Sequence, residues 1–406
     1  MEIRNIMPEE HVQYDAIRST VFLFNERKDI RLKQNEPLKH VNIDENTRIG
    51  AFDEKGRLIS ALKIIPFIFR INEKNVKMGG IASVVSKPET RGRGYVSALM
   101  KESLVRMEEE GQNFSYLYPF SYPFYRKYGY DVCREVRSAT IPLSNLRAFP
   151  FPDNMEPYEP GDSIAPYAEI YEAFIQNRNL AVVRDNADWE KLLDRDPYKN
   201  SQFTYLYRNR EGLPSAYALF DAKKTSSGNY DFESIYDFAI KEIAWREPED
   251  LRGIFGFLAK LEAEAENLQW NVPCDVDVLS LFGDCYDTKL QTGPGGMCRL
   301  VNVLEGLKTL RPPNGSGKVI VEVHDAFWTS NSGIYVLTWC SGELSVEKTS
   351  AAAPDMSTTV ETLAQLVTGY LSSDEAAYKI CTKITGNHMA LNALFPRQRL
   401  YMLEIY

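Results

Sequence analysis

Residues 80–100 read GIASVVSKPETRGRGYVSALM, which combines a predicted strand, a basic glycine-rich loop and a predicted helix. The apolar run up to Ser86 is typical of a strand, and apolar side chains recur at helical spacing from Val96 onward. The loop Arg91-Gly92-Arg93-Gly94 lies where that helix begins. A helix N-terminus offers unpaired backbone N–H groups, glycines let an anion approach closely, and arginines add charged donors. The stretch therefore predicts a cradle for a pyrophosphate group.

Two other phosphate-binding loops do not occur in this sequence. The chain has no Gly-x-x-x-x-Gly-Lys-Ser/Thr run, and no Gly-x-Gly-x-x-Gly follows a first strand. The basic loop instead resembles the Arg/Gln-x-x-Gly-x-Gly/Ala loop of the GNAT N-acetyltransferases, which holds the pyrophosphate of acetyl-CoA. Val96 stands where that family usually has a small residue. The alternative interpretation is a solvated basic turn before an amphipathic helix.

The composition is that of an ordinary globular protein. The chain has 406 residues, of which 44% are hydrophobic and 25% charged, enough for two or three domains. A net charge of −9 argues against nucleic acid as the main partner and is compatible with a cationic small-molecule substrate. No apolar run could cross a bilayer, and the N-terminus lacks a signal-peptide pattern, so we expect a cytoplasmic protein without a membrane partner. The six cysteines and four histidines have no metal-ligand spacing, so we expect no metal and reduced thiols.

The order of predicted elements divides the chain into three parts. The first part contains a strand, a helix, antiparallel strands, the basic loop, a helix and a strand, and residues 58–71 and 76–86 form a predicted hairpin. The proline-rich residues 147–163 and the glycine-rich residues 291–296 lack periodicity, so we expect boundaries there. Helices and strands are predicted both between these boundaries and after the second.

Taken together, the chain resembles the Eis (enhanced intracellular survival) family of acetyltransferases, close to the Eis-like proteins of Gram-positive bacteria. Besides the loop, the segments that carry the resemblance are Tyr122–Tyr130, Val183-Arg184 with Trp189, Ala216–Phe220, Arg299–Val303 and the aromatic tail Glu404-Ile405-Tyr406. The resemblance implies an α+β chain with a GNAT domain at residues 1–147 and a second, divergent GNAT-like domain at residues 148–294. Residues 295–406 would form an α/β domain like sterol carrier proteins. The C-terminus of the chain would enter the active site of the N-terminal domain. A homo-oligomer, usually a hexamer, is also implied.

The resemblance further implies acetyl transfer from acetyl-CoA, as co-substrate, to an amine. Aminoglycosides or other polycationic amines are the expected small-molecule acceptors. Contacts to acetyl-CoA are expected from two strand ends, the loop and the start of its helix. These residues are Val84, Val85, Ser86, Arg91, Gly92, Arg93, Gly94, Tyr95, Val96, Ser97, Phe120 and Ser121.

Tyr125 matches the catalytic tyrosine of the family and is the predicted general acid for the thiolate of CoA. A phenol of pKa about 10 stays protonated at pH 7, and proton transfer to a thiolate of pKa near 8.5 is uphill by roughly 2 kcal/mol. The resemblance assigns the base to the α-carboxylate of Tyr406, whose pKa burial would raise. Glu26 and Glu404 are predicted to contact a cationic acceptor. The alternatives are a packing role for Tyr125 among its neighbouring tyrosines and an ordinary terminal strand at Tyr406.

Two other functions stay open at this point. One is acetylation of protein lysines, which only the size of the acceptor pocket would exclude. The other is a non-catalytic carrier that binds an apolar ligand in the C-terminal domain. The loop Arg91-Gly92-Arg93-Gly94 and Tyr125 favour the enzyme, because a carrier needs neither.

Overall fold

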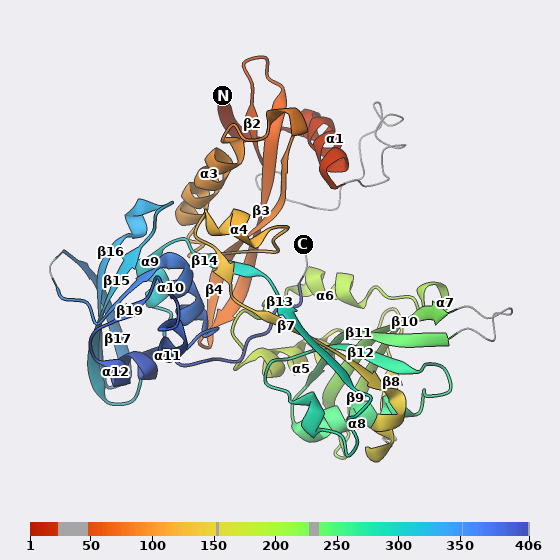
Figure 1. Cartoon of the computed structure of the whole chain (residues 1–406). Coiled ribbons are helices and arrows are strands. Elements are labelled where there is room, and N and C mark those ends of the chain that lie inside the picture. Colours follow the sequence, from red (N-terminus) through yellow and green to blue (C-terminus); the bar gives the residue numbers. More distant parts are fainter. Residues whose placement is uncertain (23–47, 152–153, 227–234, 351, 405–406) are drawn as a thin grey trace.

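The computed structural model describes residues 1–22, 48–151, 154–226, 235–350 and 352–404, which form three lobes, each with its own β-sheet (Figure 1). The first lobe is red to orange and lies at the top of Figure 1, the second is mainly green, and the third is blue. The C-terminal segment ends between the first and second lobes in this view.

The first sheet has seven strands in the order β1-β2-β3-β4-β5-β14-β6. Its elements are β1 (Glu2–Asn5), α1 (His11–Phe22), β2 (Arg48–Phe52), β3 (Leu58–Ile71), β4 (Lys74–Ser86), α3 (Tyr95–Glu109), β5 (Phe114–Leu117), α4 (Tyr122–Arg126), β6 (Asp131–Val132) and β14 (Met297–Leu300). Helices α1 and α3 cover opposite faces of this sheet. Neighbouring residues of β3 show this, because successive side chains of a strand point to opposite faces. Ala61 of β3 packs in the cluster that contains Tyr14 of α1, whereas Leu62 packs in the cluster that contains Leu99 of α3.

The second sheet also has seven strands, in the order β13-β7-β12-β11-β10-β9-β8. Its elements are β7 (Glu135–Pro142), β8 (Met155–Pro157), α5 (Ala165–Ile175), α6 (Asn186–Leu193), α7 (Pro197–Asn200), β9 (Gln202–Arg208), β10 (Pro214–Ser226), β11 (Ile235–Trp245), α8 (Pro248–Ala259), β12 (Asn267–Val272) and β13 (Lys289–Pro294). The antiparallel pair β10–β11, the helix α8 and the strand β12 parallel to β11 repeat the order of β3, β4, α3 and β5.

The third sheet has five strands in the order β17-β16-β15-β18-β19. Its elements are α9 (Val303–Leu307), β15 (Ser316–His324), β16 (Gly333–Cys340), β17 (Glu343–Thr349), β18 (Met356–Thr359), α10 (Val360–Thr368), α11 (Ser373–Ala376), β19 (Lys383–Ile384) and α12 (His388–Leu394). Short 3₁₀ turns elsewhere in the chain cover Pro8–Glu10, Pro88–Thr90, Leu143–Ala148, Val278–Ser280 and Thr329–Asn331. Helix α10 packs against β14, so the third lobe leans on the first sheet.

Strand pairing divides the chain differently from the boundaries expected at residues 147 and 294. β7 precedes residue 147 but lies in the second sheet, and β14 follows residue 294 but lies in the first. β14 pairs antiparallel with both β5 and β6. β13 includes residues 291–294 of the stretch where a boundary was expected, yet it pairs with β7 over its whole length. The first two lobes therefore exchange strands, and neither sheet is a continuous piece of sequence.

Arg299, at the centre of β14, joins the first lobe to the third. Its guanidinium is fully buried and donates to Asp325 Oδ2 over 2.6 Å and to the backbone oxygen of Tyr128. Asp325 is fully buried as well, and it also accepts from the amides of Phe327 and Trp328. Such a pair holds two lobes in one geometry, because separating the partners would leave a buried charge uncompensated.

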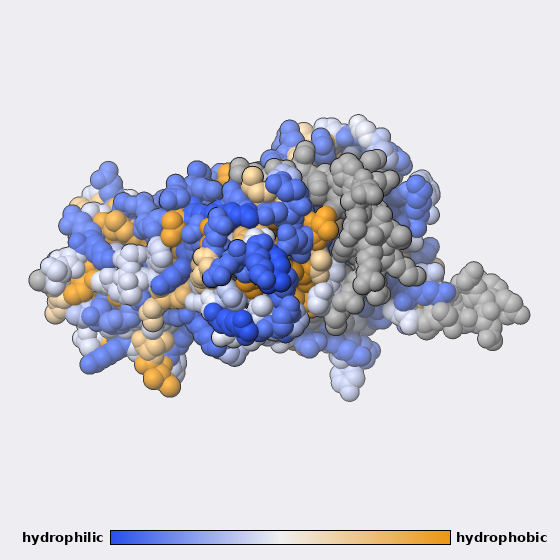
Figure 2. Space-filling view, turned by 90° about the horizontal axis from the view of Figure 1, so that it is seen from above, coloured by the Kyte–Doolittle hydropathy of each residue, from blue (hydrophilic) through white to orange (hydrophobic). Residues whose placement is uncertain are grey.

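The described surface is mainly hydrophilic on the face seen from above (Figure 2). Hydrophobic residues on that face are scattered among polar ones. Within the described ranges, no helix is both long enough and apolar enough to pass through a bilayer.

Candidate active site

The first sheet opens where β4 and β5 separate. The two strands pair in parallel from Met78 opposite Phe114 to Ile81 opposite Leu117, and there the pairing stops. β4 continues to Ser86 and stays paired with β3 on its other side. The backbone of residues 82–86 therefore has an edge that β5 does not cover. An extended ligand with amide groups, such as pantetheine, can pair with such an edge as an added strand would.

A bulge re-aims the backbone at this open edge. Ala82 lies opposite Lys63 and Val85 opposite Ala61, so Ser83 and Val84 together face a single residue of β3. Ser83 has a φ of +49°, which is rare for a residue with a side chain. Bulges bend a strand and free backbone groups, and they are common next to active sites. Of the three predicted contact residues on β4, Val85 is buried against α1, and the Oγ of Ser86 lies 2.6 Å from that of Ser60. A ligand at the open edge would therefore contact the backbone of Val85 and Ser86, not their side chains.

The predicted cradle lies at the start of α3. Gly92 and Gly94 have φ values of +79° and +81°, and Gly94 is the N-cap. No side chain caps α3, and residues 91–94 are exposed, so no described side chain satisfies the N–H groups at the start of this 15-residue helix. Arg91 and Arg93 form no ion pair with the described residues. Tyr95, Val96 and Ser97 form the first turn and are half-buried. An uncapped, basic helix start of this kind can bind a pyrophosphate group, and that role of the loop stays a prediction.

Removing the two arginines tests the cradle directly. We expect the double variant Arg91→Ala/Arg93→Ala to raise KM for acetyl-CoA about 10- to 100-fold, because charged hydrogen bonds to phosphate are lost. The value of kcat should change less than about threefold, since neither arginine lies at the reacting thioester. Lys101→Ala, which removes an exposed cation further along α3, is the matched control. An unchanged KM in the double variant, measured by initial rates, would contradict the cradle.

Tyr125 lies on the short helix α4, just beyond the end of β5. Pro123 near the start of α4 fits the helix, because its missing N–H is not needed there. The side chain of Tyr125 is buried, with its ring 5.5 Å from that of Phe120 and 5.1 Å from that of Phe124. Burial raises the pKa of the Tyr125 phenol far above its ordinary value, and Tyr130 and Tyr128 raise it further. The phenol is therefore protonated throughout the range of ordinary assays.

Phe120 and Ser121, the other two predicted cofactor contacts, immediately precede this helix. Phe120 is 71% exposed, which is unusual for a phenylalanine, and its ring covers one side of Tyr125. Ser121 is the N-cap of α4, and its backbone oxygen accepts from the amide of Tyr125. The two residues thus position Tyr125 and present an apolar surface at the open end of β5.

The C-terminal segment runs from the second lobe toward the end of β5. The amide of Tyr401 donates to the backbone oxygen of Asn179, and its ring packs on Phe174 in the core of the second lobe. The guanidinium of Arg134 donates to the backbone oxygen of Met402. Burial raises the pKa of Tyr118, the residue after β5, and the negative charge of Glu404 raises it further. Glu404 therefore lies near the edge at which β4 and β5 separate.

Glu404 itself is held by a buried arginine rather than left free. Arg184 Nη2 lies 2.8 Å from Glu404 Oε1, and both terminal nitrogens of Arg184 bond to the carboxylate of Glu242. Tyr217 donates to the same Glu242 carboxylate. The predicted contact between Glu404 and a cationic acceptor would have to compete with this pair. Glu26 and Tyr406, the other predicted acceptor contact and the predicted base, lie outside the described residues, and their roles stay predictions.

The second lobe repeats the open-sheet arrangement without a cradle. β11 and β12 pair in parallel only from Asp237 to Ala239, so they separate as β4 and β5 do. Helix α8, the counterpart of α3, begins with the acids Glu247, Glu249 and Asp250, and Glu247 and Asp250 cap each other's backbone amides. Carboxylates at that position satisfy the helix N-terminus and repel phosphate. The acetyl-CoA site is therefore expected in the first lobe alone.

Three arrangements of side chains near the site could not be predicted from local sequence, although Phe120 and Glu404 themselves were named as site residues. Arg184 is held between Glu242 and Glu404 only because distant segments meet there. Phe120 covers Tyr125 through the path of the loop after β5. A third group, around Lys63, lies on the α1 face of the sheet. Its only sequence signal is a lysine within a largely buried strand.

Profiles of known domain families match all three lobes. An acetyltransferase (GNAT) domain matches residues 2–133, a second acetyltransferase (GNAT) domain matches residues 180–300, and a sterol carrier protein domain matches residues 301–403. These matches confirm the predicted fold class, an α+β chain with two GNAT domains and a sterol carrier protein-like domain.

Similar proteins come from several bacteria. An uncharacterized N-acetyltransferase of Streptomyces avermitilis is 22% identical over 283 residues, which cover 67% of this chain and 68% of the relative. Among solved structures, a GCN5-related N-acetyltransferase from Anabaena variabilis superposes with a TM-score of 0.84 at 20% identity, and Eis1 from Mycobacterium abscessus with a TM-score of 0.81 at 18% identity. Both superpositions cover the whole of both chains. At these identities the two structures show a shared fold.

Proposed function

This chain is an N-acetyltransferase of the GNAT type, and we propose that it transfers an acetyl group from acetyl-CoA to the amine of a small molecule. The observation that carries the proposal is the combination of three features in the first lobe. They are an uncovered edge of β4, an uncapped basic helix N-terminus and a buried phenol on α4. In the described part of the second lobe the matching helix begins with acids and forms no such cradle, so one acetyl-CoA is expected per chain.

The proposed reaction is a direct transfer. The nitrogen of the neutral amine attacks the thioester carbonyl, the C–S bond breaks, and the electron pair of that bond leaves with the CoA sulfur. The Tyr125 phenol donates its proton to that sulfur, and the amine proton leaves to a base or to water. Burial makes the phenol a weaker acid than in solution, but a thiolate released in the same apolar surroundings is also a stronger base. Holding amine and thioester in contact supplies a further large part of the acceleration.

The acceptor class is part of the proposal. The resemblance to the Eis family, together with the whole-chain similarity to Eis1 from Mycobacterium abscessus, supports aminoglycosides or polyamines as acceptors and a hexamer as the assembly. Acetylation of protein lysines is the alternative within the same reaction class. Light scattering on the purified protein tests the hexamer independently of activity.

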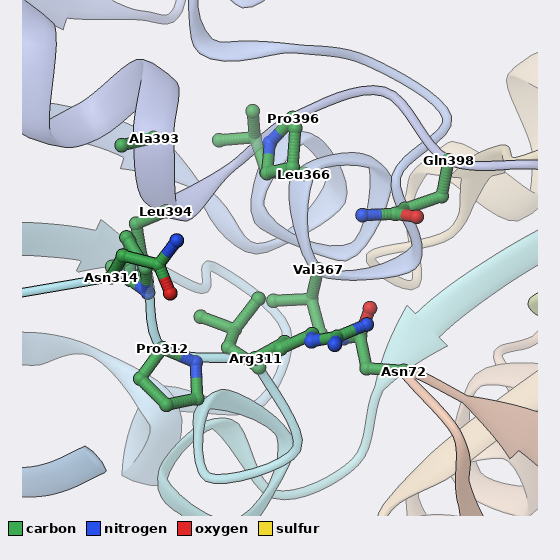
Figure 3. Close-up of a pocket in the computed structure, with 12 residues that line it drawn as sticks. Asn72, Arg311, Pro312, Asn314, Leu366, Val367, Ala393, Leu394, Pro396 and Gln398 are labelled. Carbon is green, nitrogen blue, oxygen red and sulfur yellow. The ribbon is translucent and has the colours of Figure 1, made fainter. Parts of the chain in front are cut away.

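The apolar-ligand carrier is the second candidate function, and a cavity of about 280 Å³ beside the third lobe bears on it (Figure 3). The cavity lies between the β3–β4 turn and α10. Leu366, Val367 and Leu394 line it on one side, but Asn72, Arg311 and Gln398 line the other. This volume is at the lower limit for a small-molecule site, and half of the lining is polar. The cavity therefore does not favour a lipid carrier.

The experiment that tests the proposed function measures CoA release from acetyl-CoA, by thiol detection, against a panel of amines. The panel contains aminoglycosides, polyamines, amino acids and a lysine-bearing peptide, and acetyl-CoA binding is measured in parallel by calorimetry. We expect binding, and release that depends on an added amine. Absence of both would contradict the enzyme. Release with the peptide alone would favour the protein-lysine alternative.

A further inference from the structure

Four cations gather on the α1 face of the first sheet. Arg48 of β2 and Lys63 of β3 lie directly opposite each other in the antiparallel pairing. Arg18 projects from α1, and Lys191 belongs to α6 of the second lobe. Arg48, Arg18 and Lys191 all lie close enough to Lys63 to lower its pKa. Like charges at directly opposite positions of two strands destabilise a sheet, so this arrangement has a cost in the free protein.

Burial of these cations increases the free-energy cost of placing them together. Arg48 is 9% exposed, and Lys63 is half-buried. The Nε atoms of Arg18 and Arg48 are buried and have no hydrogen-bond partner in the part of the chain that the structure describes. Burial first, and then the charges of Arg48, Arg18 and Lys191, lower the pKa of Lys63 to about 8. Cations in this state are stabilised when an anion binds to them.

The compensation available from the described residues is small. Asp15 Oδ1 lies 3.5 Å from Arg18 Nη1 on the exposed side of α1. The ring of Tyr14 lies 5.5 Å and 5.6 Å from the guanidinium carbons of Arg18 and Arg48, which gives each a weak cation–π contact. Arg48 Nη1 also lies 3.0 Å from His11 Nε2. No described carboxylate reaches Arg48 or Lys63.

The cluster lies beside the bulge at the open edge of β4. Lys63 is opposite Ala82, the residue immediately before Ser83 and Val84. Side chains alternate along β3, so Lys63 shares the α1 face with Ala61, while Leu62 and Ile64 face α3. The cradle for pyrophosphate belongs to the α3 side. The cluster is therefore separate from the predicted phosphate site of acetyl-CoA and close to the strand along which the acyl thioester is expected.

We propose that Arg48, Lys63 and Arg18 bind an anionic group, a carboxylate or phosphate, on the amine acceptor itself. This inference rests on the proposed transfer of an acetyl group to a small-molecule amine, and among such amines it favours those that also carry a negative charge over the polycations that the family resemblance supports. A polycation such as an aminoglycoside would be repelled by the same groups. The cations would also lower the pKa of the acceptor's ammonium group, which increases the fraction of neutral, nucleophilic amine.

The first arm of the test uses sulfate as the probe, with acetyl-CoA saturating so that the cradle is filled. Sulfate is titrated against chloride at constant ionic strength, and the unfolding midpoint of the wild type and of Lys63→Met is followed. We expect sulfate to raise the midpoint of the wild type and to have at least fivefold less effect on Lys63→Met. Lys55→Met, which changes an exposed lysine of the same lobe, is the control. An equal response in the wild type and Lys63→Met would overturn the anion site.

The second arm compares amines that differ only in the anion. The pairs are lysine with cadaverine, phenylalanine with phenethylamine, and glucosamine 6-phosphate with glucosamine, with kanamycin as the polycation. We expect kcat/KM at least 10-fold higher for the anionic member of an accepted pair, and Lys63→Met to remove most of this difference through KM. Equal values within pairs, or preference for kanamycin, would overturn the substrate class. No turnover of any amine, with sulfate still bound through Lys63, would sink the proposed function and leave the anion site standing.

Discussion

Replacement of Tyr125 by phenylalanine is expected to lower kcat for amine acetylation at least 100-fold, because the departing thiolate of CoA loses its proton donor. General acid catalysis contributes about 10²- to 10⁴-fold in enzymes. The phenylalanine ring keeps the contacts with Phe120 and Phe124, so the fold and the dissociation constant of acetyl-CoA should be retained within about twofold. Initial rates and calorimetry on the same preparations check both quantities.

The matched control for this prediction is Tyr128→Phe. Tyr128 is also buried, and its ring likewise packs on Phe124, but nothing in the reaction requires its hydroxyl. A loss confined to Tyr125→Phe indicates a role for one phenol, whereas equal losses in both variants would reduce Tyr125 to a packing residue.

The dependence of kcat on pH gives an independent check. A general acid must be protonated, and burial raises the pKa of Tyr125. The activity should therefore not fall with rising pH anywhere below the ordinary phenol value of about 10. A descending limb below pH 9 that disappears in Tyr125→Phe would contradict this assignment.

Replacement of Arg184 by methionine is expected to destabilise the protein by about 3–5 kcal/mol, the loss typical when one member of a buried ion pair is removed. Glu242, which is 2% exposed, and Glu404 would both lose their cation. Denaturant unfolding measures the loss. Because Arg184 also holds the C-terminal segment beside β5, kcat should fall even at temperatures at which the variant is folded. Acetyl-CoA binding should persist.

Two further variants separate stability from positioning. Glu404→Gln leaves the Arg184–Glu242 pair intact, so we expect normal unfolding together with reduced activity. Arg147→Met, which removes an equally bidentate pair with Glu262 at the surface, should leave the unfolding midpoint nearly unchanged. Full activity in both Arg184→Met and Glu404→Gln would show that the position of the C-terminal segment does not matter to the reaction.

Local signals in the sequence predict much of the first lobe. The hairpin of β3 and β4, the loop before α3 and the strand β5 follow from alternation, turn residues and helical spacing. These are short-range properties, so one sequence carries them. The same local signals predict a boundary at the glycine-containing end of β13, although glycine and proline are also tolerated in an edge strand.

Long-range pairing sets the rest. Arg48 and Lys63 have no special meaning until the register of β2 and β3 places them opposite each other. Glu404 was predicted to face a cationic acceptor, and its pairing with Arg184 depends on a contact between the C-terminal segment and the second lobe. Electrostatic function of this kind is decided by geometry that no local pattern encodes.

The place of β14 in the first sheet also sets the order in which the chain can fold during synthesis. Until residue 300 has left the ribosome, β5 and β6 lack the strand that lies between them, and Arg299 cannot reach Tyr128 or Asp325. At a synthesis rate of roughly 5–20 residues per second, the segment from β5 to β14 takes on the order of ten seconds or more to make. The lobe that begins first is thus completed late, and its unpaired strand edges are exposed meanwhile to other nascent chains.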